Sequence, residues 1–211
     1  MLVAIEGIAG SGKSTVRDRL LAAATRGGVP MVHVGQFAWL SLDATRTIVA
    51  LRAGRTAPET AAIAAVRDDL TLHARHNLAP ARSAGAVVAD RLSVSIGCLL
   101  ALLYNGPVRR YLAPLAEVEA ARPNLTILLT TPVATCLQRL QRRSTGRRFG
   151  ETPATAARLA ALYQEAAQAW TEVTGDLVLT RPCIEPGDAD LLVTTVLEHL
   201  PTGCTPSGAR P

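Results

Sequence analysis

The chain has 211 residues, of which 48% are hydrophobic and 18% charged, a composition that suits one compact domain with a sizeable core. Its net charge of +5 comes from arginines spread along the sequence, and only 3% of the residues are aromatic, so no basic stripe or base-stacking motif favours nucleic acid as a partner. No apolar run reaches the length of a membrane span and no signal-peptide pattern opens the sequence, which predicts a cytoplasmic protein with no membrane partner.

Short apolar runs alternate with stretches of helical periodicity from the N-terminus onward. The predicted strands are residues 2–6, 31–34, 86–89, 125–129 and 177–179. The predicted helices start at Lys13 and then cover 40–53, 57–81, the two sides of a break at 105–107, 133–143, 153–174 and 188–200. This alternation implies right-handed crossovers, and therefore an α/β fold of three layers: a five-stranded parallel sheet with helices on both faces.

A phosphate-binding motif lies between the first strand and the first helix. The sequence GIAGSGKS, residues 7–14, matches G-x-x-x-x-G-K-[ST], in which backbone N–H groups and a helix start face the phosphates. Lys13, the only lysine in the chain, is expected to bridge the β- and γ-phosphates of ATP, and the Ser14 hydroxyl to ligate Mg²⁺. The predicted ATP-binding residues are Gly7, Ala9, Gly10, Ser11, Gly12, Lys13, Ser14, Thr15 and Arg143.

Asp90 and Arg91 follow the third strand directly, at the sheet edge that carries the phosphate loop. Asp90 is expected to hold Mg²⁺ through water or to accept a proton from the acceptor, and Arg91 to clamp a phosphate or the transferring group. The local sequence fits equally well a helix cap followed by an exposed arginine.

An arginine-rich segment of about residues 144–152 has glycines at 146 and 150, which predicts a mobile lid. Arg147 and Arg148 are expected to act in catalysis by bringing positive charge over the reacting phosphate while water is excluded. The motifs together predict an ATP-dependent kinase domain over residues 1–200. A disordered tail is expected over 201–211, which has three prolines and two glycines.

The order of these elements resembles the thymidylate kinase family, over about residues 2–180. The resemblance rests on Glu6-Gly7-Ile8, Asp90-Arg91 with Ser95, Pro123-Asn124-Leu125-Thr126, the segment 147–151, and the helix 157–170 with Tyr163 at its centre. It implies a P-loop kinase fold with a five-stranded parallel core, often a homodimer, with ATP on one side of the lid and a small-molecule acceptor beneath the strand ends.

The departures from this family fall on the acceptor side. Ala9 replaces an aspartate inside the phosphate loop, His-Val-Gly-Gln-Phe at 33–37 replaces an Arg-Glu-Pro-Gly-Gly segment, and Leu70 replaces an arginine. Apolar residues 98–100 replace an aromatic and glutamine pair that contacts thymine. Because each change removes a contact to thymidine monophosphate, the sequence indicates an intact donor half and a rebuilt acceptor half.

The charged residues of the acceptor half indicate the class of acceptor. Fixed cations that could meet an acceptor phosphate are depleted. The third predicted helix instead carries carboxylates and histidines, which would suit a neutral or cationic acceptor with a hydroxyl. The alternative is that these side chains are solvated on the helix surface. The predicted acceptor contacts are Gln36, Phe37, Asp68, Asp69, His73 and Arg91. The first hypothesis is therefore a kinase of a nucleoside or an aminoglycoside-like natural product, with a role in antibiotic biosynthesis or self-resistance. The alternatives are a thymidylate or other nucleoside monophosphate kinase, and a non-catalytic P-loop nucleotide-binding protein.

Overall fold

Five parallel strands form a single sheet in the order β2-β3-β1-β4-β5. The computed structural model describes residues 1–143, 146 and 148–200. The central strand β1 pairs with β3, where Leu2 lies opposite Val87, and with β4, where Val3 lies opposite Leu125. The strands are β1 Leu2–Glu6, β2 Met31–Val34, β3 Ala86–Asp90, β4 Leu125–Leu129 and β5 Leu177–Arg181. The predicted five-stranded parallel sheet is confirmed.

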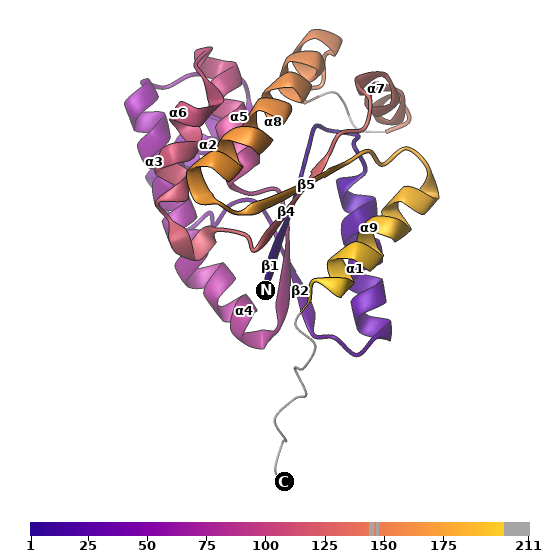
Figure 1. Cartoon of the computed structure of the whole chain (residues 1–211). Coiled ribbons are helices and arrows are strands. Elements are labelled where there is room, and N and C mark those ends of the chain that lie inside the picture. Colours follow the sequence, from indigo (N-terminus) through magenta and orange to yellow (C-terminus); the bar gives the residue numbers. More distant parts are fainter. Residues whose placement is uncertain (144–145, 147, 201–211) are drawn as a thin grey trace.

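Helices cover both faces of the sheet (Figure 1). Side chains of β1 alternate between the two faces: Val3 and Ile5 pack with one apolar cluster, and Leu2 and Ala4 with the other. The first face is covered by α1 Lys13–Arg26 and α9 Pro186–Glu198. The second face is covered by α2 Leu42–Arg52, α3 Glu59–His73, α5 Ser93–Tyr104, α6 Val108–Ala116 and α8 Pro153–Thr174. The three-layer prediction is therefore confirmed.

Smaller elements complete the fold and modify one predicted helix. The helix expected over 57–81 is α3 followed by a π-helical turn, Ala74–Leu78, and α4 Ala79–Ala84. Pro80 lies inside this run, and its ring would meet the carbonyl of the residue four positions earlier in a regular α-helix. The wider π turn ends two residues before Pro80, so the chain continues as a helix past the proline. The remaining short elements are the 3₁₀ turn Glu119–Ala121 and α7 Val133–Gln141.

The carboxyl ends of β1 and β3 place the predicted chemistry at one edge of the sheet. Residues 7–12 connect β1 to α1, and Asp90 is the last residue of β3. In an open parallel sheet, ligands bind at the carboxyl ends of the strands, at the point where the strand order changes direction. In this sheet that point is β1, which has β3 on one side and β4 on the other. Within the described residues, no helix is long and apolar enough to cross a membrane.

The predicted lid is described only in part. Arg148, Phe149 and Gly150 form a turn that leads to Glu151, and Thr152 caps α8 by accepting a hydrogen bond from the Thr155 N–H at 3.3 Å. Ser144, Thr145, Arg147 and the tail 201–211 lie outside the described residues.

Candidate active site

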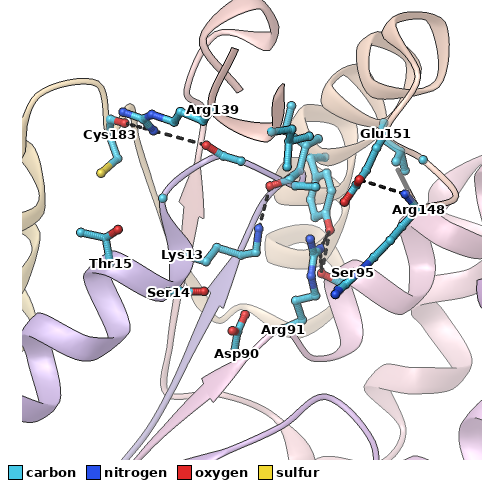
Figure 2. Close-up of a pocket in the computed structure, with 18 of the residues that line it drawn as sticks. Lys13, Ser14, Thr15, Asp90, Arg91, Ser95, Arg139, Arg148, Glu151 and Cys183 are labelled. Carbon is cyan, nitrogen blue, oxygen red and sulfur yellow. Dashed lines mark hydrogen bonds between the residues drawn. The ribbon is translucent and has the colours of Figure 1, made fainter. Parts of the chain in front are cut away.

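A cleft of about 670 Å³ opens at the carboxyl edge of the sheet (Figure 2). Its walls come from the phosphate loop, the end of β3, α5, α7, the turn 148–151, α8 and the segment after β5. The sequence-predicted residues that line it are Ala9, Gly10, Gly12, Lys13, Ser14, Thr15, Gln36, Asp90, Arg91, Arg143 and Arg148.

The phosphate loop presents backbone donors at the start of α1. Gly12 is the N-cap of α1, with a left-handed φ of 105°, and no side chain caps the first turn of the helix. The N–H groups of that turn are therefore available to phosphate oxygens, at the positive end of the helix dipole. The loop also packs closely on α7: a Cβ on Gly10 would lie 2.5 Å from the Cys136 carbonyl oxygen. Gly7 and Ser11 belong to the loop but do not line the cleft.

Lys13 lies beneath the loop, with only 7% of its surface exposed. Its Nζ donates hydrogen bonds to the carbonyl oxygens of Gly7, at 3.0 Å, and Ile8, at 2.6 Å. Burial lowers the pKa of Lys13 well below its usual value, and the positive charge of Arg91 lowers it further. Phosphate oxygens bound in the cleft would counter both effects, because a nearby negative charge favours the ammonium form.

Asp90 and Ser14 are the oxygen-bearing side chains that lie beside Lys13 in the cleft (Figure 2). The Asp90 carboxylate accepts a hydrogen bond from the guanidinium of Arg17 at 3.1 Å and remains partly exposed. Among the described residues, no group of three or more metal-binding side chains occurs. Magnesium at nucleotide sites needs no such group, since one or two protein side chains and the phosphates suffice. Ser14 and Asp90 could therefore hold the ion.

Arg91 is fixed by a buried polar network. Its φ of 71° is left-handed, and its guanidinium donates hydrogen bonds to Ser95 Oγ at 3.1 Å and to the Tyr163 hydroxyl at 2.6 Å. The same Ser95 hydroxyl bonds to the fully buried Glu6, whose other oxygen accepts the Leu92 N–H at 2.8 Å. Burial raises the pKa of Glu6, partly offset by the Ser95 hydrogen bond and the charge of Arg91. The network orients Arg91 toward the cleft.

Arg52 is a cleft residue that sequence reasoning missed. It is the last residue of α2, and its guanidinium lies 5.7 Å from the ring centroids of both Phe37 and Trp39. Desolvation lowers the pKa of Arg52, and so do the charges of Arg148 and Arg91. Phe37, predicted to touch the acceptor, does not line the cleft and instead supports this arginine. No motif identifies Arg52, because its contacts come from residues 13 to 15 positions earlier and from the far side of the cleft.

Three guanidinium groups, those of Arg52, Arg91 and Arg148, thus lie near one another in the cleft. In the described part of the chain, no carboxylate oxygen lies within 4.0 Å of any of them. Figure 2 shows the Arg148 side chain extending toward Ser95 and Arg91. The arrangement is a cationic patch suited to an anion.

The acidic and histidine residues predicted at the acceptor lie elsewhere. Asp68 is exposed on α3, and His73 is buried with a pKa lowered by burial; neither lines the cleft. Asp69 is also buried, and its two carboxylate oxygens accept the backbone N–H groups of Ala38, at 2.9 Å, and Trp39, at 3.0 Å. Asp69 therefore holds the segment that carries the rings beneath Arg52.

Arginines of the α7 end support the donor side. Arg143, a predicted nucleotide contact, pairs with Glu151 at 3.2 Å and lines the cleft. Arg139 also lines the cleft and donates hydrogen bonds to the carbonyl oxygens of Gly10 at 3.3 Å, Cys183 at 2.9 Å and Ile184 at 2.7 Å. It ties the phosphate loop to the segment after β5. Arg147 lies outside the described residues.

Comparison with known proteins agrees with the geometry of the cleft. The chain has no match among curated proteins. The family model for thymidylate kinase matches residues 5–175, a span that includes the phosphate loop, Arg52, the Asp90-Arg91 pair, the described arginines of the lid and Tyr163. A kinase of this family is an ATP-dependent phosphotransferase, and the chain belongs to the thymidylate kinase family.

Proposed function

We propose that the protein is a nucleoside monophosphate kinase that transfers the γ-phosphoryl group of ATP, with Mg²⁺, to the phosphate of its acceptor. The observation that carries this proposal is the patch formed by Arg52, Arg91 and Arg148. The family match supports the same class of acceptor.

The patch favours a phosphorylated acceptor over a neutral one. Taking a phosphate dianion out of water is costly unless fixed cations meet it. The pKa of Arg52 is depressed by desolvation and then by its like-charged neighbours, and an anion between them would relieve that repulsion. The sequence indicates that such cations are depleted. The structure adds a cation, the Arg52 guanidinium at the end of α2, which sequence motifs do not identify. The carboxylates expected to meet a hydroxylated or cationic acceptor do not line the cleft.

The residues around the cleft suit an in-line transfer. An oxygen of the acceptor phosphate would form a bond to the γ-phosphorus as the bond from that phosphorus to the β,γ-bridging oxygen breaks, leaving ADP. Lys13 would neutralise charge on the transferring group, Arg91 and Arg52 would hold the acceptor phosphate, and Arg148 would contact both the acceptor phosphate and the transferring group. Ser14 and Asp90 would hold Mg²⁺, which would supply positive charge to the phosphates during the transfer. A proton on the acceptor phosphate would pass to Asp90 or to solvent.

A panel assay tests the proposal. The protein is incubated with ATP and Mg²⁺ and with nucleoside monophosphates (dTMP, dUMP, dCMP, UMP, CMP, AMP and GMP), nucleosides or aminocyclitols. We expect ADP release and a nucleoside diphosphate from at least one monophosphate. Turnover confined to nucleosides or aminocyclitols would instead support the natural-product alternative, and slow ADP release independent of any acceptor would support a non-catalytic nucleotide-binding protein.

Arg52→Gln separates acceptor binding from donor binding. Losing charge-assisted hydrogen bonds should raise the KM for the monophosphate about 10- to 100-fold and change the KM for ATP less than about twofold. Arg55→Gln is the matched control, because Arg55 is an exposed arginine of the same turn that does not line the cleft. Equal behaviour of the two variants would remove Arg52 from the acceptor site.

The resemblance also implies a homodimer. We propose this as the solution state, and analytical ultracentrifugation would test it.

A further inference from the structure

Phe149 lies against a glycine on the opposite side of the cleft. Gly54, two residues after Arg52, has a left-handed φ of 76°. A Cβ on Gly54 would lie 2.6 Å from Cδ2 and 2.7 Å from Cε2 of the Phe149 ring, closer than any real side chain allows. The ring therefore occupies the space that only a glycine leaves free.

This contact joins two segments that each carry a cleft arginine. Arg148 directly precedes Phe149, and Arg52 precedes Gly54 by two residues; both arginines line the cleft. After desolvation, the charge of Arg148 is the largest influence that lowers the pKa of Arg52, so the two guanidinium groups interact electrostatically. The contact of Phe149 with Gly54 thus links the two segments that carry these like charges.

The segment of Phe149 is held from its other end as well. Glu151 is 6% exposed, and one of its carboxylate oxygens accepts the backbone N–H of Arg148 at 2.9 Å. The other pairs with Arg143 at 3.2 Å. The Arg148 backbone is thus fixed on the α7 and α8 side of the cleft, and Phe149 reaches from it to the end of α2.

We infer that Phe149 is a positioning residue for acceptor binding: its seat on Gly54 holds Arg148 and Arg52 on either side of the acceptor's phosphate. The inference rests on the proposed function. Holding two like charges close together is unfavourable in the free protein, and an anion placed between them removes that cost. A protein without the Phe149 contact would let Arg148 move away from Arg52, so acceptor affinity would fall while the phosphate loop stayed unchanged.

A role in stability alone predicts something different. Phe149 is 39% exposed, so its removal sacrifices less buried apolar surface than removal of a core aromatic residue. If Phe149 had a purely structural role, its removal would lower the unfolding temperature and the amount of active enzyme. The ratio of the acceptor KM to the ATP KM would stay the same.

Steady-state kinetics with the best monophosphate of the panel provide the first test. Phe149→Ala should raise the acceptor KM about tenfold, with the ATP KM within about twofold, because a charge-assisted contact to the phosphate is weakened. Phe149→Leu, which keeps an apolar contact, should restore most of the affinity. Gly54→Ala should act like Phe149→Ala, since the new methyl group displaces the ring.

Gly175→Ala is the matched control for Gly54→Ala. Gly175 has nearly the same backbone conformation, with a φ of 74°, but nothing lies within 4 Å of an added Cβ. Both variants carry the strain of a side chain at positive φ, and only Gly54→Ala loses the seat of Phe149. An acceptor KM that rises equally in both, or in neither, would overturn the inference.

Limited trypsin digestion gives a second test that needs no acceptor. Cleavage after Arg148, followed by mass spectrometry, should be faster in Gly54→Ala than in the wild type and in Gly175→Ala. Equal cleavage rates would overturn the Phe149 contact as a restraint even if a monophosphate is phosphorylated. Faster cleavage in Gly54→Ala, together with a wild type that phosphorylates no monophosphate, would instead reject the proposed function and keep the restraint.

Discussion

The two sides of the cleft are built in different ways. The donor side is one continuous strand, loop and helix, in which residues 7–15 supply backbone N–H groups and Lys13. The acceptor side is assembled from the side chains of separate elements: Arg52 at the end of α2, Arg91 after β3, and Arg148 before α8. A site made of consecutive backbone can be recognised as a motif, whereas a site made of distant side chains depends on the whole fold.

The comparison also predicts different responses to substitution. Loss of a central donor group should affect catalysis itself, because that group acts on the transferring phosphate. Loss of one acceptor-side contact should only partly weaken acceptor binding, because the other arginines remain.

Lys13→Ala should produce the largest effect. Turnover should fall about 10²- to 10³-fold or more, since the charge facing the transferring phosphate is lost. Lys13→Arg should not restore it, because a planar guanidinium cannot adopt the position of the compact ammonium beneath the loop. ADP release and the unfolding temperature are measured together. A stably folded Lys13→Ala protein with near-native turnover would reject the donor site as described.

Asp90→Asn should lower turnover about 10²-fold while ATP still binds, as expected for loss of a metal-holding or proton-accepting carboxylate. Asp18→Asn is the control, because Asp18 pairs with the same Arg17 at 2.8 Å but does not line the cleft. Turnover is measured across Mg²⁺ concentrations, and ATP affinity by calorimetry. Similar turnover in both variants would mean that Asp90 acts only as a partner of Arg17.

Tyr163→Phe should give the smallest of these effects. It removes the 2.6 Å hydrogen bond that orients Arg91 and leaves the guanidinium in place, so the acceptor KM should rise about tenfold or less. Tyr104→Phe removes a similar hydroxyl contact, to the Ala57 carbonyl at 2.7 Å, away from the cleft. If the two variants have the same acceptor KM, the buried network does not position Arg91.

Most of the fold could be predicted from the sequence, because apolar runs and glycine or proline breaks are local signals. The strands 2–6, 31–34 and 125–129 and the helix 153–174 have the predicted bounds. The single helix predicted over 57–81 is interrupted by a π turn before Pro80. The sequence does not predict this turn, because a π turn has no sequence signature of its own.

The sequence predicted the donor part of the candidate site better than the acceptor part. The cleft includes the motif residues, Asp90 and Arg91, whose positions follow from strand ends. Arg52 was missed and Asp69 was given a substrate role, because burial and partners decide what a charged helix residue does. Asp69 faces backbone N–H groups inside the protein, while Arg52 faces the cleft.

The setting of Lys13 has a consequence for chemical labelling. It is the only side-chain amine in the chain, and burial and the charge of Arg91 lower its pKa, which favours the nucleophilic amine over the ammonium. An acylating reagent shaped to enter the cleft would therefore meet a single lysine side chain, at the centre of the donor site. Modification of that one amine would report directly on whether nucleotide occupies the protein.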